Sequence, residues 1–296
     1  MVNKMAQSEY GFKQISFNEL PKFSEWPERL LSPELLQFKP KTTEEVTREF
    51  EHEKWGKLLE QVTLTPSTNV RQLEELSSDF NSRIPCIIDG DFALGTGLEV
   101  LDYQIGLIHS VIKPHLGEAS ALVELGAGFG SKILGMAERF DLGTIPLVAA
   151  EYTASGVKLI KRAAQSSGIE ISVGRCDFRS ASIDPHLVPE GAIIFTSYAA
   201  HYVPTYTSQF INHLIDMKPK VIIHFEPFYE HYALDNIHGL MCRRYVEVND
   251  YTQNLGAMLD EGEHGGFVRI TKVRKNIFGD NPFLPASIVE WVPVQN

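Results

Sequence analysis

Three acidic residues follow or end three short apolar segments of the chain. Glu124 lies in "ALVELGAGFGS", Glu151 in "PLVAAEY" and Asp177 in "GRCDF". If these segments are parallel strands, their carboxylates meet at one edge of the sheet, where α/β proteins bind ligands. Gly126 and Gly128 allow the backbone to turn sharply and to approach a ligand closely. The pattern therefore predicts a ligand site with one carboxylate from each strand.

The residue types favour an adenosine compound without phosphates. Nicotinamide and flavin enzymes also use a glycine-rich turn, but a charge such as Glu124 is unfavourable beside a pyrophosphate. Glu151 can accept hydrogen bonds from both ribose hydroxyls. Asp177 can accept from an exocyclic adenine amine while Phe178 covers the ring. The alternative is an α/β protein in which these acids are ordinary cap and turn residues.

This combination resembles the class I S-adenosylmethionine (SAM)-dependent methyltransferases of the small-molecule type, over residues 119–292. "VELGAGFGS" resembles the family's glycine loop, "AAEY" its ribose acid and "CDF" its adenine-side acid. The resemblance implies SAM as cofactor and, as binding residues, Glu124, Gly126, Ala127, Gly128, Glu151, Tyr152, Asp177, Phe178 and Ser197. Tyr103 and Gln104 are expected near the methionine carboxylate, with helix packing as the alternative for Tyr103.

The fourth apolar segment ends in "TSYAAHYVP", which this fold places beside the reactive sulfonium. The faces of Tyr198 and Tyr202 can hold a sulfonium by cation–π attraction. His201 can serve as general base, because its ordinary pKa lies near neutral pH; the alternative is a solvent-facing histidine at a helix start. Glu226, in "HFEPFYEHY", lies at the next strand end and is expected in the acceptor pocket.

Metal-dependent and base-methylating subfamilies fit this sequence poorly. The fourth segment has no D/N-P-P-Y/F motif, which argues against methylation of exocyclic amines of bases. No aspartate stands at its end as a first magnesium ligand, and the histidines show no tight ligand spacing. We therefore expect a metal-independent reaction and assign no metal ligands.

Short apolar runs alternate with amphipathic segments from Ala119 onward. The expected strands are "ALVEL", "PLVAAE", "EISVG", "GAIIFTSY", "KVIIHFE", "FVRITKV" and "SIVEWVP". Helical segments separate the first five, which is typical of a parallel sheet, whereas only a loop joins the last two. The sequence predicts an α/β fold: a Rossmann-like, seven-stranded, mainly parallel sheet with an antiparallel C-terminal hairpin. We expect residues 117–296 to form this catalytic domain and residues 1–116 to form an N-terminal helical cap.

Composition limits the partners. The net charge of -11 argues against a nucleic-acid substrate, since nucleic-acid binders usually present a basic face. Apolar runs end well before membrane-spanning length. The three widely separated cysteines form no zinc-type pair or disulfide framework, which fits a reducing cytoplasm. We expect a cytoplasmic protein acting on a small molecule, without nucleic acid or membrane; the oligomeric state stays open.

Three functions remain from this pattern. The first is SAM-dependent methyl transfer to an oxygen, nitrogen or carbon of a metabolite in small-molecule biosynthesis. The second is a lyase or cyclase that forms azetidine-2-carboxylate and methylthioadenosine from SAM alone. The third is a non-catalytic SAM-binding subunit, which the intact acids and the aromatic segment make the least favoured. The acceptor itself is not identified by any motif.

Overall fold

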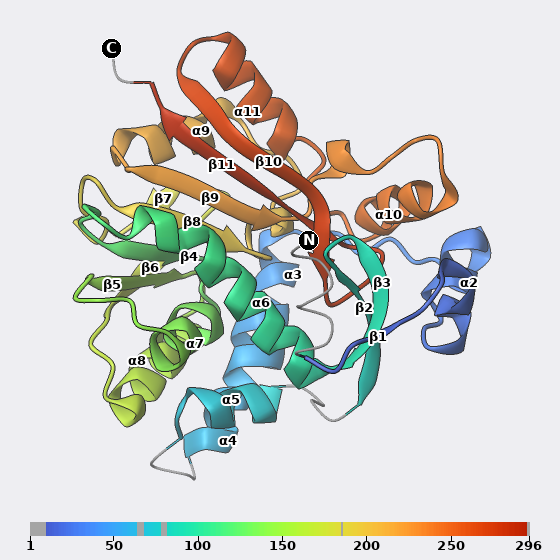
Figure 1. The fold of residues 1–296 in the computed structure, drawn as a ribbon, viewed down its shortest axis with the longest axis horizontal. Coiled ribbons are helices and arrows are strands. Elements are labelled where there is room, and N and C mark those ends of the chain that lie inside the picture. Colours follow the sequence, from blue (N-terminus) through green and yellow to red (C-terminus); the bar gives the residue numbers. More distant parts are fainter. Residues whose placement is uncertain (1–9, 64–67, 78–81, 185, 295–296) are drawn as a thin grey trace.

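The computed structural model describes residues 10–63, 68–77, 82–184 and 186–294 (Figure 1). One mixed sheet runs through it, in the order β1-β3-β2-β10-β11-β9-β8-β4-β5-β6-β7. The strands are β1 (Lys13–Gln14), β2 (Arg83–Ile88), β3 (Asp91–Thr96), β4 (Leu122–Leu125), β5 (Leu147–Glu151), β6 (Ser172–Asp177), β7 (Ser182–Ile183), β8 (Ile193–Ser197), β9 (Val221–Glu226), β10 (Val268–Gly279) and β11 (Ala286–Pro293).

Helical segments connect and cover these strands. The α-helices are α2 (Trp26–Leu31), α3 (Thr43–Thr47), α4 (Trp55–Thr63), α5 (Val70–Ser77), α6 (Gly97–Ile112), α7 (Ser131–Arg139), α8 (Ala154–Ser167), α9 (Ser208–Asp216), α10 (Ile237–Val248) and α11 (Leu255–His264). The 3-10 turns are η1 (Phe17–Lys22), η2 (Pro33–Leu35), η4 (Lys113–His115), η5 (Ala200–Tyr202) and η6 (Tyr229–His231), and η3 (Arg48–Lys54) is a π-helix. No helix in the described ranges combines the length and apolar composition of a membrane span.

The centre of the sheet is parallel. Strands β6, β5, β4, β8 and β9 are parallel neighbours, whereas β11 pairs antiparallel with both β9 and β10. Every residue of β4, β5, β8 and β9 is buried, because helices cover both faces of these strands. These observations confirm the predicted α/β class.

The predicted number of seven strands is wrong, because the sheet has eleven strands within the described ranges. Two of the additional strands, β2 and β3, form a hairpin inside the N-terminal part that we expected to be helical, and β2 pairs with β10. The two turn residues, Asp89 and Gly90, have φ angles of 52° and 88°. Asp-Gly between apolar runs is a strong hairpin signal, and it stands in the sequence "CIIDGDFAL". The division at residue 116 into two domains stays a prediction.

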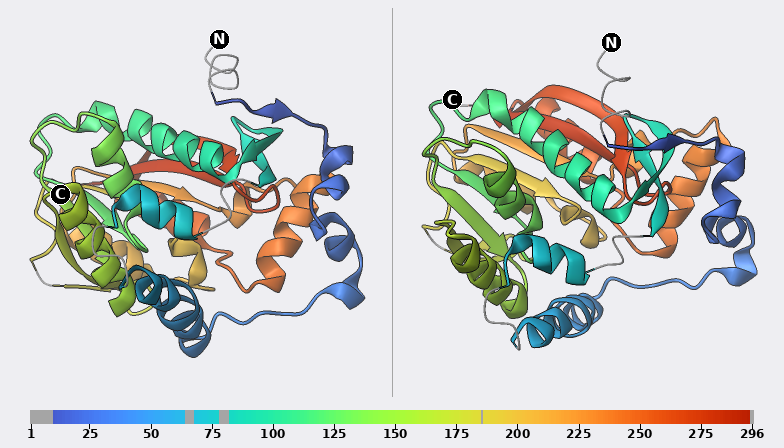
Figure 2. Two further views of the ribbon diagram at one scale, coloured as in Figure 1. Left: turned by 90° about the horizontal axis from the view of Figure 1, so that it is seen from below. Right: turned by 60° about the horizontal axis from the view of Figure 1, so that its bottom comes forward.

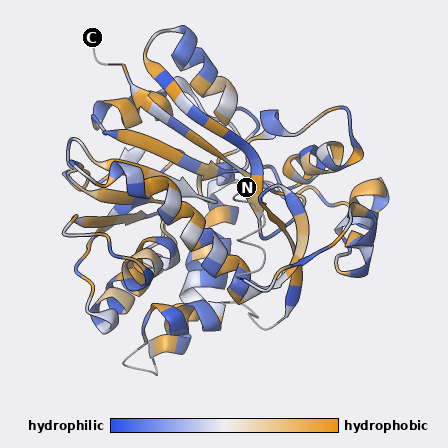
Figure 3. Ribbon diagram, in the orientation of Figure 1, coloured by the Kyte–Doolittle hydropathy of each residue, from blue (hydrophilic) through white to orange (hydrophobic). Residues whose placement is uncertain are grey.

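Two layers of side chains hold the helices on the sheet. One cluster packs residues of α4 to α8 on one face, and a second packs α9 and α11 on the other (Figures 1 and 2). Apolar residues concentrate in the central strands, while the helices alternate between apolar and polar stripes (Figure 3). A third cluster joins α2 and α10 to the turn between β10 and β11. The sheet's carboxyl edge is therefore framed by helices on both sides.

Candidate functional site

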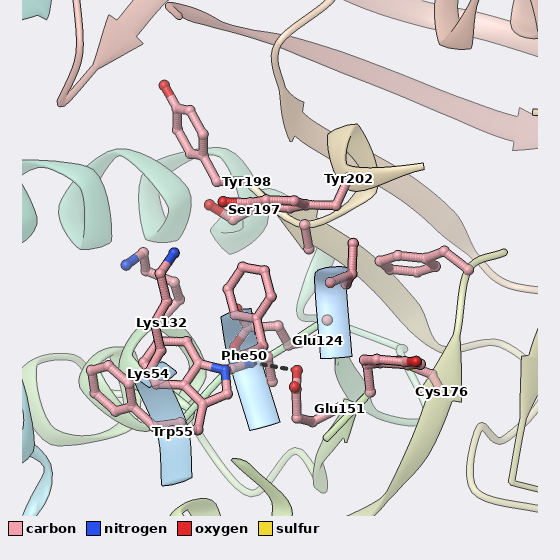
Figure 4. Close-up of a pocket in the computed structure, with 18 of the residues that line it drawn as sticks. Phe50, Lys54, Trp55, Glu124, Lys132, Glu151, Cys176, Ser197, Tyr198 and Tyr202 are labelled. Carbon is pink, nitrogen blue, oxygen red and sulfur yellow. Dashed lines mark hydrogen bonds between the residues drawn. The ribbon is translucent and has the colours of Figure 1, made fainter. Parts of the chain in front are cut away.

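A cavity of about 370 Å³ lies at the carboxyl ends of the parallel strands, a size typical of small-ligand sites (Figure 4). Most of the predicted cofactor residues line it: Gln104, Glu124, Gly126, Ala127, Gly128, Glu151, Tyr152, Asp177, Phe178 and Ser197. Tyr198 and Tyr202, two of the predicted catalytic residues, line it as well. Tyr103, His201 and Glu226 are not among the lining residues.

The loop after β4 brings bare backbone to the cavity. Gly126 has a φ of 75°, and a Cβ there would lie 2.4 Å from the Cβ of Ala199. Gly128 has a φ of 59°, and a Cβ there would lie 3.1 Å from the ring of Trp55. Both the left-handed conformation and the close neighbours exclude larger residues without strain. At these two positions the cavity wall therefore consists of backbone atoms without a side chain.

Glu151, at the end of β5, is a buried carboxylate on the cavity wall. One oxygen accepts from the amide of Gly128 at 2.8 Å, and the other from the amide and hydroxyl of Thr153 at 3.0 and 2.8 Å (Figure 4). Burial raises its pKa above the ordinary value, and these hydrogen bonds oppose that shift. Each carboxylate oxygen has two lone pairs, so Glu151 retains acceptor capacity for ligand hydroxyls.

Glu124 and Lys132 form a pair of ionisable groups in the wall. One oxygen of Glu124 accepts from the amide of Ile133 at 3.0 Å, at the start of α7. Burial raises the pKa of Glu124, and the nearby Lys132 ammonium opposes that shift. Burial in turn lowers the pKa of Lys132, while Glu124 opposes this. The two side chains thus stabilise each other's charged form in the wall.

Asp177, at the end of β6, is partly buried and bound within its own turn. Its oxygens accept from the amide of Arg179 at 2.9 Å and from the hydroxyl of Ser180 at 2.8 Å. Phe178 lines the cavity next to it and contacts Phe210 edge-on, with ring centroids 5.7 Å apart. An aromatic face and a carboxylate edge therefore stand together at this end of the cavity.

Gln104 and Tyr103 are neighbours in α6 but point to different surroundings. The amide nitrogen of Gln104 donates to the hydroxyl of Ser197 at 3.1 Å, and both residues line the cavity. Tyr103 instead packs among aromatic rings, edge-on to Phe12 at 5.8 Å and stacked on Phe278 at 6.0 Å. The structure thus gives Gln104 direct access to a ligand and gives Tyr103 a place in the core.

Tyr198 lines the cavity, but its side chain points away from the other lining residues (Figure 4). Its hydroxyl donates to the carbonyls of Phe278 and Leu284, both at 3.1 Å, and burial raises its pKa well above 10. Its φ of 51° is unusual for a residue with a side chain. Tyr202 lies across from Phe50, edge-on at 4.8 Å. The rings of Tyr202 and Phe50 therefore lie together at the end of the cavity next to β8.

His201 and Glu226 form a buried pair behind this wall. Glu226 accepts from the amides of Ala199 and Ala200 at 2.9 and 3.0 Å, and its second oxygen lies 3.3 Å from Nδ1 of His201. His201 is 2% exposed, so it does not face solvent. Its ring contacts Tyr202 and Tyr251. In this geometry Glu226 supports the turn that carries Tyr198 and Tyr202.

Sequence reasoning missed several residues that line the cavity. The N-terminal part of the chain covers the cavity with three side chains of η3 and α4: Phe50, Lys54 and Trp55 (Figure 4). Lys132 follows the glycine loop, and Asp280 comes from the turn between β10 and β11. We call residues 43–63, which form α3, η3 and α4, the covering segment. Thr42 caps its start, since the Thr42 hydroxyl accepts from the amide of Glu45 at 3.2 Å. No local pattern shows, however, that the aromatic side of the segment faces a ligand.

Metal ligands do not gather in the described ranges: no three His, Cys, Asp or Glu side chains come together there in an arrangement that could hold an ion.

No protein-family model matches the sequence, and neither does any curated protein. In structure, the chain is similar to magnesium protoporphyrin IX methyltransferase from Synechocystis PCC 6803 with bound SAH, with a TM-score of 0.51 and 11% identity over 84% of this chain and 99% of that chain. It is also similar to PigF with SAH (TM-score 0.41, 14% identity, 84% and 72% covered). A third similar structure is geranyl diphosphate C-methyltransferase from Streptomyces coelicolor A3(2) (TM-score 0.45, 12% identity, 64% and 78% covered). The first likeness shows that this chain shares the fold of that methyltransferase.

Proposed function

We propose that this chain is a SAM-dependent methyltransferase that acts on a small molecule without a metal ion. One observation carries the proposal. Glu124, Glu151 and Asp177, from the ends of three neighbouring parallel strands, line a single cavity together with the glycine loop. A ligand lying along this edge meets a carboxylate at each strand, which suits the amino, ribose and adenine groups of SAM.

The cavity wall fits such a cofactor in three places. Glu151 has acceptor capacity left for ribose hydroxyls, and the flat ring of Phe178 can cover an adenine beside Asp177. The backbone at Gly126 and Gly128 can approach the ligand because no Cβ stands in the way. Bound SAM would supply an electrophilic methyl group, and the chain would position it and exclude water.

The covering segment supports the exclusion of water. The rings of Phe50 and Trp55 close the cavity from the N-terminal side, and Trp55 contacts Phe129 edge-on at 5.3 Å. On the opposite wall lies the ring of Tyr202, and an aromatic face is worth roughly 0.5 to 2 kcal/mol toward a cation. We propose a metabolite as acceptor, because the net charge of -11 disfavours nucleic acid. A cytoplasmic location remains part of this proposal.

Ligand binding tests the cofactor assignment. SAM and S-adenosylhomocysteine (SAH) should raise the melting temperature and NAD should not, because only a ligand that binds the native state stabilises it. Glu151→Ala should weaken SAH binding by about 1 to 3 kcal/mol, or roughly 5- to 150-fold, in calorimetry. Glu170→Ala, which removes an exposed carboxylate outside the cavity, is the matched control. Equal SAH affinity in folded Glu151→Ala and wild-type protein would refute the ribose role.

The products formed from SAM alone test the reaction. Methyl transfer needs a second substrate, so purified protein with SAM alone should form almost no SAH. Intramolecular cyclisation needs only SAM, and orientation effects of roughly 7 to 11 kcal/mol can drive it. Methylthioadenosine as the main product, measured by chromatography, would replace the transferase with the cyclase. Absence of any product after a search of acceptors, with SAM bound, would favour a non-catalytic subunit.

A further inference from the structure

Asp280 is an acid of the cavity that the proposed function leaves without a role. It lies in the turn between β10 and β11, and its exposed side chain is one of the cavity-lining groups. Asp177 belongs to β6, near one edge of the sheet, whereas β11 lies beyond β8 and β9 in the opposite direction. The two aspartates therefore approach the cavity from opposite sides.

Asp280 lies at the end of the cavity opposite Asp177, the acid expected beside the adenine. Its charge interacts with Lys132 of α7 and with Tyr198, which follows β8. Figure 4 shows Lys132 and Tyr198 on one side of the cavity and Cys176, the neighbour of Asp177, on the other. A ligand with its adenine at Asp177 and its ribose at Glu151 thus directs its remaining part toward Asp280.

The carboxylate of Asp280 differs from the other acids of the cavity. Glu124, Glu151 and Asp177 all accept hydrogen bonds from backbone amides or hydroxyls. In the part of the chain that the structure describes, no side chain forms an ion pair or hydrogen bond with Asp280, and its nearby donors are backbone amides, among them that of Asn281. This acid is thus free to respond to a ligand.

Several titratable groups surround Asp280. Lys132 and His201 are the positively charged or ionisable bases that lower its pKa, but burial raises the pKa above its ordinary value. The charge of Asp280 also raises the pKa of four other groups. These are Cys86 in β2, Tyr198 after β8, and Tyr245 and Tyr251 in and after α10. The carboxyl group, which is accessible from the cavity but surrounded by protein atoms, is therefore easier to protonate than an aspartate in water.

We propose that ionised Asp280 is the counter-charge of the sulfonium in the SAM complex and takes up the acceptor's proton when that charge disappears, an inference that rests on the proposed function. In the transfer, the methyl carbon–sulfur bond breaks and its electron pair stays on sulfur, which becomes a neutral thioether. The acceptor's oxygen or nitrogen forms the new bond to the methyl carbon. The acceptor's proton moves to the Asp280 carboxylate, so atoms and charge balance. The acceptor is accordingly a molecule with an O–H or N–H group.

A thermodynamic cycle makes this step measurable without the acceptor. The difference in bound protons between the SAH complex and the SAM complex equals the proton uptake of the protein during transfer. Binding calorimetry with SAM and with SAH, in buffers of different ionisation enthalpy and from mildly acidic to mildly alkaline pH, gives this difference. We expect SAM binding to release up to about one proton and SAH binding to release none. The affinity ratio of SAM to SAH should therefore rise with pH.

Asp280→Asn should leave the affinity for SAH within about threefold of the wild type. It should also make the ratio of SAM affinity to SAH affinity independent of pH. At alkaline pH that ratio should be roughly tenfold lower or more, since a nearby opposite charge shifts a titration by 1 to 3 pKa units. Asp91→Asn, on the exposed start of β3, removes the same charge outside the cavity and should change neither quantity.

Four outcomes separate the possibilities. Binding of neither SAM nor SAH to the wild type would overturn the proposed function itself. Binding of both, with equal proton release in the wild type, would overturn only the role of Asp280, even if the variant failed to fold. A pH-dependent ratio that persists in folded Asp280→Asn would also overturn it. An equal loss of SAM and SAH affinity in Asp280→Asn would mean instead that the carboxylate holds the amino-acid group common to both.

Discussion

Glu151 of β5 and Glu226 of β9 are glutamates at strand ends of the same sheet. They make similar hydrogen bonds to the backbone, but only one of them faces a cavity. Each is buried, and each accepts hydrogen bonds from backbone amides of a turn. Glu151 lines the cavity, whereas Glu226 does not. Burial raises the pKa of both, but for Glu226 the hydrogen bond from His201 and those from Ala199 and Ala200 outweigh burial, so its pKa is lowered.

The difference comes from what covers each end of the sheet. Over β5, the covering segment leaves open space between its aromatic rings and the strand ends (Figure 4). Behind the turn after β8, His201, Tyr202 and Tyr251 fill the space around Glu226 with packed rings. A carboxylate at a strand end can thus either contact a ligand or stabilise a neighbouring turn. Which of the two it does depends on how segments distant in the sequence pack over it.

The largest expected effect is a loss of stability when Glu226 no longer holds the turn at Ala199, Ala200 and His201. We call this set of contacts the clamp. Glu226→Ala leaves the amides of Ala199 and Ala200 and the His201 ring without their buried acceptor, so the free energy of unfolding should fall by about 3 to 5 kcal/mol. Denaturant unfolding measures this. Glu226→Gln keeps an acceptor oxygen and should lose less. If Glu226→Ala unfolds like the wild type but loses turnover, Glu226 acts on the substrate and the comparison is wrong.

Acid unfolding gives the same clamp a pH signature. Because the folded pKa of Glu226 is lowered, its stabilisation is complete above the ordinary glutamate pKa and is lost as pH falls through the folded pKa. Glu226→Gln should therefore show a shallower loss of stability in acid than the wild type. Parallel acid unfolding curves for the two proteins would show that Glu226 does not gain this stabilisation on folding.

A smaller effect is expected at the cavity wall. Gly128→Ala must adopt a φ of 59° with its Cβ 3.1 Å from the Trp55 ring, so stability should fall by about 1 to 2 kcal/mol. The shifted wall should also weaken SAH binding in calorimetry. Gly143→Ala is the control, because its φ of 69° imposes similar strain but no atom lies within 4 Å of its Cβ. Equal SAH affinity in both variants would show that the loop backbone does not approach the ligand.

The sequence predicted much of the ligand wall and little of its cover. Glu124, Glu151 and Asp177 were predictable because strand ends follow from local apolar runs, and parallel pairing brings those ends together. Phe50, Trp55 and Asp280 were not, because their position depends on contacts between segments far apart in the chain. The separation of Glu226 from the cavity has the same cause. Only the β2–β3 hairpin was missed despite a local signal, at Asp89 and Gly90.

The smallest expected effect is at the contact that fastens the cover to the ligand wall. Glu51 of η3 accepts from the amide and hydroxyl of Ser155 at 3.2 and 2.6 Å, at the first turn of α8. A carboxylate at a helix N-terminus contributes about 0.5 to 1 kcal/mol. Glu51→Gln should therefore change global stability little and speed SAH dissociation a few-fold in stopped-flow experiments, because the cover opens more often. Glu53→Gln, in the same π-helix, removes an exposed carboxylate that forms an ion pair with Arg48 at 3.8 Å, and is the matched control. Unchanged dissociation in Glu51→Gln would show that the contact between Glu51 and Ser155 does not control release of the ligand.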